Sequence, residues 1–387
     1  MSKKKKGFKH WIGKLHLWLG MASGLIVLIL SVTGCIYVFS VEITEALRED
    51  VMYVPEVKMK PIAVSKLWDD TQQKIGDQFK ISSVKVSKDP QKTYIFGCYK
   101  GNEDGITYFG SIDYYKSIYV NPYSGEILKI YDEEMDFFNI VKFIHWSLLI
   151  SGDIGQQIVG WSTFIFVIML LTGIILWWPK NKAARKQRFK FQWKKTTQWK
   201  RKNYDIHNIF GFYIATIAII IAFTGMVWAF TWFQATVYVL GSGTTIAPEI
   251  VNKKADVTLP KVANAMEVAL QKSRIAYPTA DALSMAKPAD SVATVDVYVQ
   301  QNENTYYVAH QMRFDQKTGE ILLNRNHTDK NFGEQLITAN YDIHVGAILG
   351  IPGKILAFIA SFICGMLPVT GFLIWYGRTF KKSKAKK

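Results

Sequence analysis

Four long stretches of this chain contain no charged residue, and each is long enough to cross a membrane. A helix needs about 20 apolar residues to cross roughly 30 Å of hydrocarbon. The four stretches are Leu17–Phe39, Ile154–Pro179, Ile206–Phe233 and Ile355–Tyr376. The sequence therefore predicts an α-helical membrane protein with four transmembrane helices. Because four crossings return a chain to its starting side, both termini are expected on one side of the membrane.

The basic residues are concentrated beside these stretches. Three segments hold 6, 11 and 6 Lys and Arg and no Asp or Glu: Met1–Lys14, Lys180–Asn203 and Gly377–Lys387. Such segments stay in the cytoplasm, which predicts cytoplasmic termini. The formal charge is +16, but outside these segments the chain is net acidic, so no nucleic-acid partner is expected. We expect the loop Lys180–Asn203 to contact anionic lipid rather than to dock a cytosolic protein.

Aromatic residues and cysteines add smaller constraints. Trp177–Trp178 and Trp375–Tyr376 end two of the apolar stretches, and we expect them at the level of the lipid headgroups. The three cysteines are too few and scattered for a disulfide framework or a thiolate metal site. Val32–Cys35 resembles a lipoprotein cleavage site, but the apolar run continues to Phe39, so we expect the N-terminus to be retained.

Two segments of about 100 residues, at 41–136 and 234–335, lie between the crossings on the outer side. Each is expected to fold by itself. Each begins with a helical pattern, at Ile62–Ile75 and Pro260–Ile275, and continues with alternating β-rich stretches. These patterns predict a helix packed on an antiparallel sheet, which is an α+β domain. The β-rich stretches are Thr93–Tyr99, Ser117–Val120, Thr294–Val299 and Tyr306–Phe314.

The two outer segments end in near-copies of one another. Tyr119–Leu128 and Arg313–Leu322 each begin a tight turn at Asn121 or Asp315 and place a glycine where φ can be positive. Two hairpins with one turn sequence indicate a duplication. The expected boundaries are 1–14, 15–40, 41–136, 137–179, 180–203, 204–233, 234–335, 336–376 and 377–387.

The membrane stretches repeat as well, and each repeat carries two histidines. In the first and third crossings a histidine precedes a Thr-Gly pair by 17 residues; in the second and fourth the spacing is 27 and 26 residues, with a glycine-containing interruption between. The predicted topology places His16 and His207 near the cytoplasmic face, and His145 and His344 near the outer face. The sets are His16 with Thr33-Gly34, His207 with Thr224-Gly225, His145 with Thr172-Gly173 and His344 with Thr370-Gly371.

Histidines paired at two depths favour a shared ligand. Neutral imidazole binds iron, and two imidazoles on facing helices can hold a haem between them. Gly20 and Gly211 each follow a histidine by about one helical turn, and we expect them to leave room for the macrocycle. A zinc site normally takes four ligands, so we favour haem over a bare metal ion. A single histidine in such a stretch more often has a packing role, but four in register with a repeat favour ligation.

The other three histidines are not expected to be ligands. His10 lies in the basic N-terminus and His327 in a polar loop, so both are expected in solvent. His310 alternates with Val308, Met312 and Phe314, which favours a satisfied histidine on an apolar face.

Some of these motifs resemble a known family. Lys14–Gly20 with Thr33-Gly34, together with Tyr119–Leu128 and Arg313–Leu322, resembles the PepSY-associated transmembrane family over nearly the whole chain. The resemblance implies a bacterial inner-membrane protein with two PepSY-like extracytoplasmic domains. Its best understood members resemble di-haem reductases of ferric siderophores, which implies two b-type haems. By this resemblance the inner haem is held by His16 and His207, and the outer one by His145 and His344.

The resulting hypothesis is an oxidoreductase that conducts electrons across the membrane and reduces a ferric chelate, such as a ferric siderophore, at the periplasmic side. Lys180–Asp205 is too short for a nucleotide-binding domain, so the donor is expected to be a membrane quinol or a separate cytosolic reductase. One alternative is a non-redox binding or regulatory protein that the helices anchor. Another is a permease, which the small number of crossings and the lack of intramembrane carboxylates disfavour.

Overall fold

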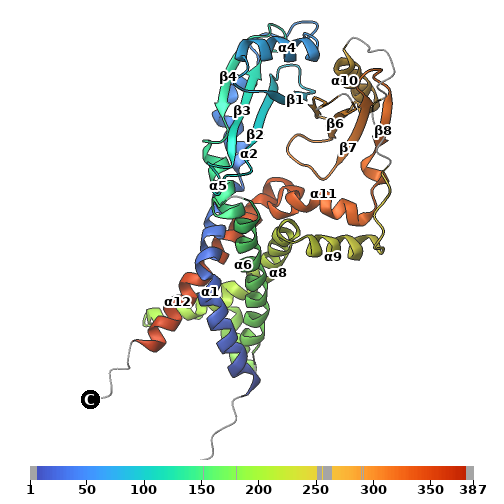
Figure 1. The fold of residues 1–387 in the computed structure, drawn as a ribbon. Coiled ribbons are helices and arrows are strands. Elements are labelled where there is room, and N and C mark those ends of the chain that lie inside the picture. The colour runs from blue at the N-terminus through green and yellow to red at the C-terminus, as the bar shows by residue number, and fades with distance from the viewer. Residues whose placement is uncertain are drawn as a thin grey trace, which may run out of the picture. The chain divides into compact units, whose positions relative to one another are not determined.

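The computed structural model describes residues 7–150, 152–179, 181–250, 255, 264–288, 290 and 292–380. The chain forms two compact units (Figure 1). The helix bundle consists of Met1–Val38, Val141–Phe233 and Ile343–Lys387. The sheet unit consists of Phe39–Ile140 and Gln234–Asp342.

Four long helices form the bundle. Helix α1 packs against α6 and α12, and α8 packs against the same two helices. All four helices are long and apolar enough to cross a membrane, which confirms the four predicted crossings as helices of spanning length. The helices are α1 (Phe8–Tyr37), α6 (Gly152–Trp177), α8 (Trp199–Ala229) and α12 (Gly350–Thr379).

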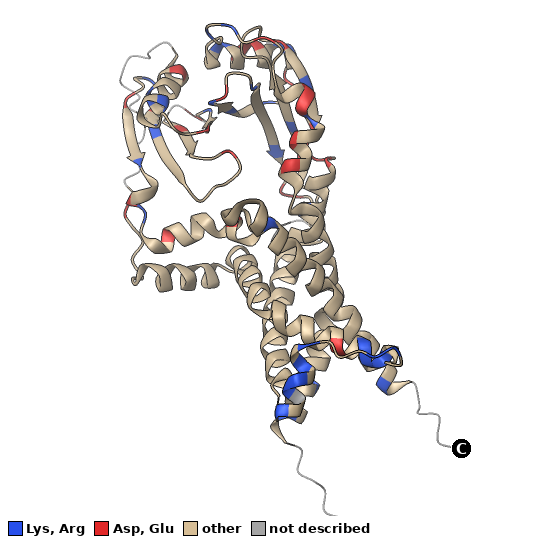
Figure 2. Ribbon diagram, turned by 180° about the vertical axis from the view of Figure 1, so that it is seen from behind, with Lys and Arg blue, Asp and Glu red and all other residues tan. Residues whose placement is uncertain are grey.

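The long helices extend beyond the apolar stretches at their basic ends. Helix α1 begins at Phe8 and α8 at Trp199, several residues before the predicted apolar runs, because Lys and Arg are good helix formers. Lys and Arg of these helices and of α7 (Lys182–Phe189) gather at one end of the bundle (Figure 2). The segment 381–387 of the predicted basic tail lies outside the described residues.

One of the two tryptophans at the end of α6 is covered by other residues of the protein. Trp177 is only 3% exposed, and its ring stacks on Phe212 with the centroids 3.6 Å apart and the planes 6° from parallel. Phe189 of α7 packs edge-on against Trp177, with centroids 4.8 Å apart. The loop between α6 and α8 therefore folds back and covers Trp177. Trp178 is 64% exposed and remains available to headgroups.

Two short helices precede α6 and α12, namely α5 (Phe137–Ser147) and α11 (Phe332–His344). In the turn after α5, Leu148 and Leu149 have positive φ, 56° and 59°. In the corresponding turn after α11, the residue with positive φ is a glycine, Gly346, at 78°. The predicted glycine interruption is thus displaced, because α6 begins at Gly152 and Gly155 lies inside it. Gly155 is needed there because a Cβ would meet the Ser147 carbonyl of the turn.

The sheet unit contains one antiparallel sheet of eight strands, in the order β4-β3-β2-β1-β5-β6-β7-β8. Helix α4 (Val64–Ile75) precedes the first four strands, and α10 (Ala265–Ala276) precedes the last four. The predicted helix and antiparallel sheet are therefore present in each half; residues 260–263 of the second predicted helix lie outside the described residues. The strands are β1 (Ile81–Ser87), β2 (Tyr94–Gly101), β3 (Ile112–Val120), β4 (Ile127–Asp132), β5 (Ala282–Ala286), β6 (Thr294–Gln300), β7 (Ala309–Asp315) and β8 (Ile321–Arg325). The remaining short helices are α2 (Ser40–Leu47), α3 (Glu49–Met52), α9 (Thr231–Ser242), η1 (His327–Asp329) and η2 (Ala347–Leu349).

The two halves of the sheet do not fold as separate bodies. Strands β1 and β5 pair antiparallel along a seam, with Val84 opposite Met285. Both side chains are buried in one core that also contains Leu67 of α4 and Leu270 of α10. A four-stranded sheet leaves unpaired edges, and here each half covers an edge of the other.

The two predicted hairpin turns are confirmed. The Asn121 side chain accepts the backbone N–H of Tyr123 at 2.9 Å, and the Asp315 side chain accepts that of Lys317 at 2.8 Å. In both turns the predicted glycine has positive φ, 71° at Gly125 and 67° at Gly319. The turn sequence therefore specifies the same backbone twice.

Candidate functional site

The helix bundle brings the four singled-out histidines together in two pairs. His16 of α1 and His207 of α8 form the first pair, with ring centroids 6.4 Å apart and ring planes at 89°. His145 near the end of α5 and His344 at the end of α11 form the second, with centroids 6.0 Å apart and planes at 73°. The histidines that were predicted to lie at the same depth are therefore neighbours in the structure.

Each histidine also has a threonine partner. In all four cases the ring Nδ1 lies 2.9 Å from a threonine Oγ1. Every one of these threonines belongs to a Thr-Gly pair on a long helix of the same repeat. The four pairs are His16 with Thr172, His145 with Thr33, His207 with Thr370 and His344 with Thr224.

The hydrogen-bond pattern assigns the tautomer of the histidines. Each threonine hydroxyl already donates to a backbone carbonyl one turn earlier, as Thr33 does to Ile29 at 2.7 Å and Thr370 to Met366 at 2.8 Å. The Oγ1 atom is therefore the acceptor for the ring. For His344, Nδ1 also hydrogen-bonds to a backbone carbonyl, which can only accept, namely the Ile221 oxygen at 3.1 Å.

This pattern has a chemical consequence. With the proton on Nδ1, the other ring nitrogen, Nε2, carries a lone pair and can bind a metal. All four rings share the pattern, so the bundle presents four Nε2 atoms of this kind in two pairs.

The glycine after each threonine provides the surface against which the ring packs. A Cβ on Gly371 would lie 3.3 Å from Cε1 of His207, and one on Gly173 would lie 3.4 Å from Cε1 of His16. The corresponding distances are 3.5 Å from Gly34 to His145 and 3.6 Å from Gly225 to His344. We call each Thr-Gly pair with its bound ring a histidine seat. The seat holds the ring by a hydrogen bond on one atom and by close contact on the next.

The threonines were not predicted as partners of the histidines. The signal was present, because the Thr-Gly pair recurs at matched distances from a histidine in every crossing. The partners could not be assigned from the sequence because each threonine lies on a different helix from the histidine that it holds. Spacing along the chain does not show which helices are neighbours.

Gly20 and Gly211, predicted to leave room for a macrocycle, lie against side chains of neighbouring helices. A Cβ on Gly20 would lie 2.7 Å from Cε of Met169, and one on Gly211 would lie 3.4 Å from Cδ2 of Leu367. Met169 and Leu367 each stand three residues before a seat threonine, so the two environments match. Their flexible, apolar ends line the bundle beside the first histidine pair.

Polar side chains in the first turns of α8 hold this helix in place beside the first pair. The Asn203 side chain donates to the Thr370 carbonyl at 3.0 Å, one residue before the glycine that supports His207. Nearby, the Asp205 carboxylate accepts from Arg201 at 2.9 Å and from Trp193 at 3.1 Å. These bonds fix the start of α8, which carries His207.

The other three histidines lie apart from these pairs. His10 is exposed at the start of α1. His310 stacks on Tyr277 with centroids 4.3 Å apart and accepts the backbone N–H of His327 at 3.1 Å, as expected of a satisfied histidine. His327, predicted to be solvated, is only partly exposed, and its Nδ1 is buried with no hydrogen-bond partner among the described residues. Within the described part of the chain, no group of three or more His, Cys, Asp or Glu side chains could hold a metal ion.

The fold and the seats define a class of protein: a membrane protein with four helices of spanning length that carries two half-buried histidine pairs and a helix-and-sheet unit. The chain matches the family described as the PepSY-associated TM region over residues 14–378. It belongs to the PepSY-associated transmembrane family, as its motifs indicated. No curated protein matches the sequence significantly.

Proposed function

We propose that this chain binds two b-type haems, one on each histidine pair, and conducts electrons across a bacterial inner membrane. The terminal acceptor in this proposal is a ferric chelate, such as a ferric siderophore, at the periplasmic side. The chain would then be a haem-dependent ferric-chelate reductase. The observation that carries the proposal is the set of four identical histidine seats arranged in two close pairs.

The spacing within each pair suits two ligands on one iron. With a metal–nitrogen bond of about 2 Å and about 1.1 Å from nitrogen to ring centre, two imidazoles that held one metal would have centroids up to about 6 Å apart. The observed separations are 6.4 and 6.0 Å. A porphyrin also needs an apolar surround, which Met169 and Leu367 offer beside Gly20 and Gly211.

The two pairs stand far enough apart to serve opposite faces of a membrane. Helix α1 carries His16 of the first pair and, 17 residues later, the threonine that holds His145 of the second. At 1.5 Å per residue these positions are about 25 Å apart along the helix. Helix α8 connects His207 with the seat of His344 in the same way. Each of these helices therefore fixes both levels at once.

The protein residues have definite tasks in this proposal. Haem, when bound, supplies an iron that exchanges one electron at a time. The threonine hydroxyls keep the proton on Nδ1, orient the rings and raise the basicity of Nε2. The seat glycines let the rings lie close to the helix backbone. Electrons would come from a membrane quinol or a separate cytosolic reductase, and the segment that ends at Asn203 lies next to the first pair, where they would enter.

A spectrum of the purified full-length protein tests the proposal. We expect a dithionite-reducible b-type spectrum with two haems per chain, measured as the pyridine haemochrome. His16→Ala and His207→Ala should remove the same haem, and His145→Ala and His344→Ala the other. His10→Ala, which changes an exposed histidine outside the pairs, is the matched control and should retain both.

Two results would contradict the proposal. A full-length protein that contains no stoichiometric haem, even when expressed with ample haem, would leave the non-redox alternative of a membrane-anchored binding or regulatory protein. Loss of both haems in every single variant would contradict the pairing, although not the presence of haem.

A further inference from the structure

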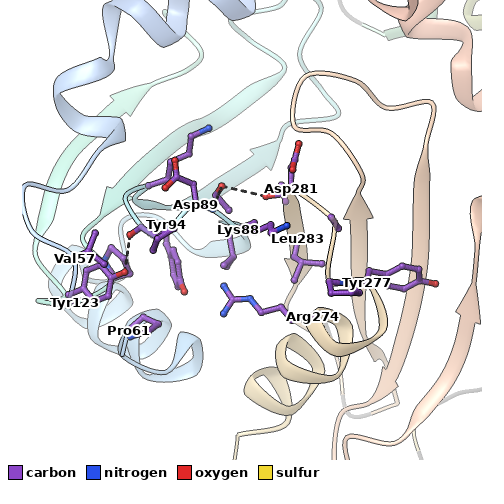
Figure 3. Close-up of a pocket in the computed structure, with 18 of the residues that line it drawn as sticks. Val57, Pro61, Lys88, Asp89, Tyr94, Tyr123, Arg274, Tyr277, Asp281 and Leu283 are labelled. Carbon is purple, nitrogen blue, oxygen red and sulfur yellow. Dashed lines mark hydrogen bonds between the residues drawn. The ribbon is translucent and has the colours of Figure 1, made fainter. Parts of the chain in front are cut away.

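A cleft opens in the sheet unit beside the seam between β1 and β5 (Figure 3). Its volume is about 470 Å³, within the usual range for small-molecule sites. The first half of the sheet unit contributes the segment before α4 and the loop between β1 and β2. The second half contributes the end of α10 and the start of β5. The cleft therefore depends on the union of the two halves.

A guanidinium group points into this cleft without a carboxylate partner. Arg274, in the last turn of α10, extends toward Tyr94 of β2 (Figure 3), and its positive charge acts on the Tyr94 phenol. Burial raises the pKa of Tyr94, so the phenol is neutral at pH 7 and does not compensate the positive charge. Among the described residues no carboxylate lies within ion-pairing distance of Arg274.

A second cation enters from the opposite wall. Lys88, in the loop after β1, reaches into the cleft from the first half (Figure 3). Asp89 and Asp281 also line the cleft but lie on the far side from the guanidinium of Arg274. Lys92, a further lining residue, is paired with Glu303. The available positive charge therefore comes from Arg274 and Lys88, one on each wall.

The fold does not require these cleft residues. Lys74 and Lys272 occupy the same place in α4 and α10, since each donates to the turn glycine carbonyl of its own half. Counting from these lysines, the position of Arg274 corresponds to Gly76 in the first half. Tyr94 pairs with Val120, the residue before Asn121 of the first hairpin turn. In the second half, Val295 pairs with the residue before Asp315 of the second turn, so Val295 corresponds to Tyr94. The two halves of the sheet unit therefore differ at Arg274 and Tyr94, two of the residues that line the cleft.

We propose that this cleft binds a small organic polycarboxylate. The planar guanidinium of Arg274 suits one carboxylate, which it can bind through two parallel hydrogen bonds, and Lys88 suits a second from the facing wall. Pro61 and Leu283 line the space between and offer apolar contact to a carbon skeleton, which an inorganic anion lacks. Both free organic acids and their ferric chelates present this chemistry. The proposal does not depend on haem.

Calorimetric titration of the full-length protein with citrate and with gallium citrate, a redox-inert analogue of the ferric chelate, tests this proposal. We expect saturable binding of at least one of them. Arg274→Gln should weaken it by about 10-fold or more, because a hydrogen bond to a charged group is lost. Lys88→Gln, a change at an exposed loop residue that leaves the fold intact, should weaken it by several-fold. Lys129→Gln removes an exposed lysine of β4 outside the cleft and should have no effect.

Each outcome decides something. Binding of citrate alone identifies free organic acids as the ligand class, and binding of gallium citrate alone identifies metal chelates; both support the proposal. Absence of binding by either probe, equal affinity for inorganic phosphate, or unchanged affinity in both Arg274→Gln and Lys88→Gln would overturn it. Because the His16→Ala and His145→Ala variants should bind as the native protein does, failure here is distinguishable from failure of the haem proposal.

Discussion

The helix bundle and the sheet unit are both built from two similar halves, but they use the similarity differently. In the bundle, all four histidines meet a threonine at 2.9 Å and a glycine at the next position. In the sheet unit, the halves share the order of elements and the hairpin turns, while Arg274 stands where the other half has Gly76. The two halves of the bundle therefore carry the same functional side chains. The two halves of the sheet unit share the same order of helix and strands but differ in the side chains near the seam.

The largest effect is expected from filling a histidine seat. Gly371→Leu would place a side chain where the His207 ring lies, since a Cβ alone would already be 3.3 Å from Cε1. We expect this variant to lose the inner haem and retain the outer one, and Gly225→Leu, against His344, to do the reverse. The haem content per chain and the reduced-minus-oxidised spectrum measure both.

Gly13→Leu is the matched control for these seat variants. A Cβ at Gly13 would lie 3.8 Å from Leu176, which is ordinary contact, so both haems should remain. If Gly371→Leu and Gly225→Leu kept full haem content, the four seats would be packing contacts only. The repeated side chains of the bundle would then have no role in ligand binding.

The sequence predicted the bundle better than the sheet unit for a physical reason. Apolar length and flanking charge specify a spanning helix locally, so the four helices of spanning length and the grouping of the histidines into two pairs followed from the chain alone. The seam between β1 and β5 did not follow, because pairing between two strand edges leaves no local pattern. The burial of Trp177 did not follow for a related reason, since only the fold shows that Phe189 and Phe212 cover it.

The next largest effect concerns ion pairs that hold each half of the sheet unit. Arg48, 7% exposed, binds Glu133 at 2.6 Å and Asp136 at 3.1 Å, and its guanidinium lies 4.1 Å from the Tyr131 ring centre. Arg48→Met leaves two carboxylates without their cation and should lower the free energy of unfolding by about 3 kcal/mol. Hydrogen exchange of β3 and β4 in the full-length protein measures the loss.

The second half offers a comparison and the surface a control. Arg325 binds Glu334 at 2.6 Å, but a single carboxylate is involved, so Arg325→Met should cost less than Arg48→Met. Lys100→Met breaks an exposed pair with Asp113 and should leave the free energy of unfolding almost unchanged, because solvent screens the pair. Equal losses for all three variants would show that burial does not set the strength of these pairs.

A smaller effect is expected when a seat threonine loses its hydroxyl. Thr370→Val and Thr224→Val keep the shape but remove the acceptor for Nδ1–H, which makes the imidazole less basic and disfavours the ferric state. A tenfold change in relative affinity for the two oxidation states corresponds to about 59 mV. We therefore expect the midpoint potential of the inner or outer haem, respectively, to rise by tens of millivolts, as potentiometric titration would show. A fall in potential, or an equal shift at both levels from one variant, would contradict the assignment of seats.

The smallest effect is a pH dependence within the sheet unit. The pKa of His310 is lowered by burial first, and then by His327 and Lys330, with Asp329 acting in the opposite direction. Its Nδ1 accepts a hydrogen bond from the His327 backbone, so the neutral ring is the form that the fold holds. As the pH falls below about 6.5, the unfolded chain binds more protons than the folded one, and the free energy of unfolding decreases. Because the ring is only half-buried, the decrease should stay below the ~1.4 kcal/mol that one pKa unit represents. His310→Gln should flatten this dependence of the free energy of unfolding on pH between pH 7 and pH 5, and hydrogen exchange of β7 and β8 measures it. His10→Gln is the control and should leave the dependence unchanged. A steeper dependence in His310→Gln would show that the sheet unit stabilises the charged ring.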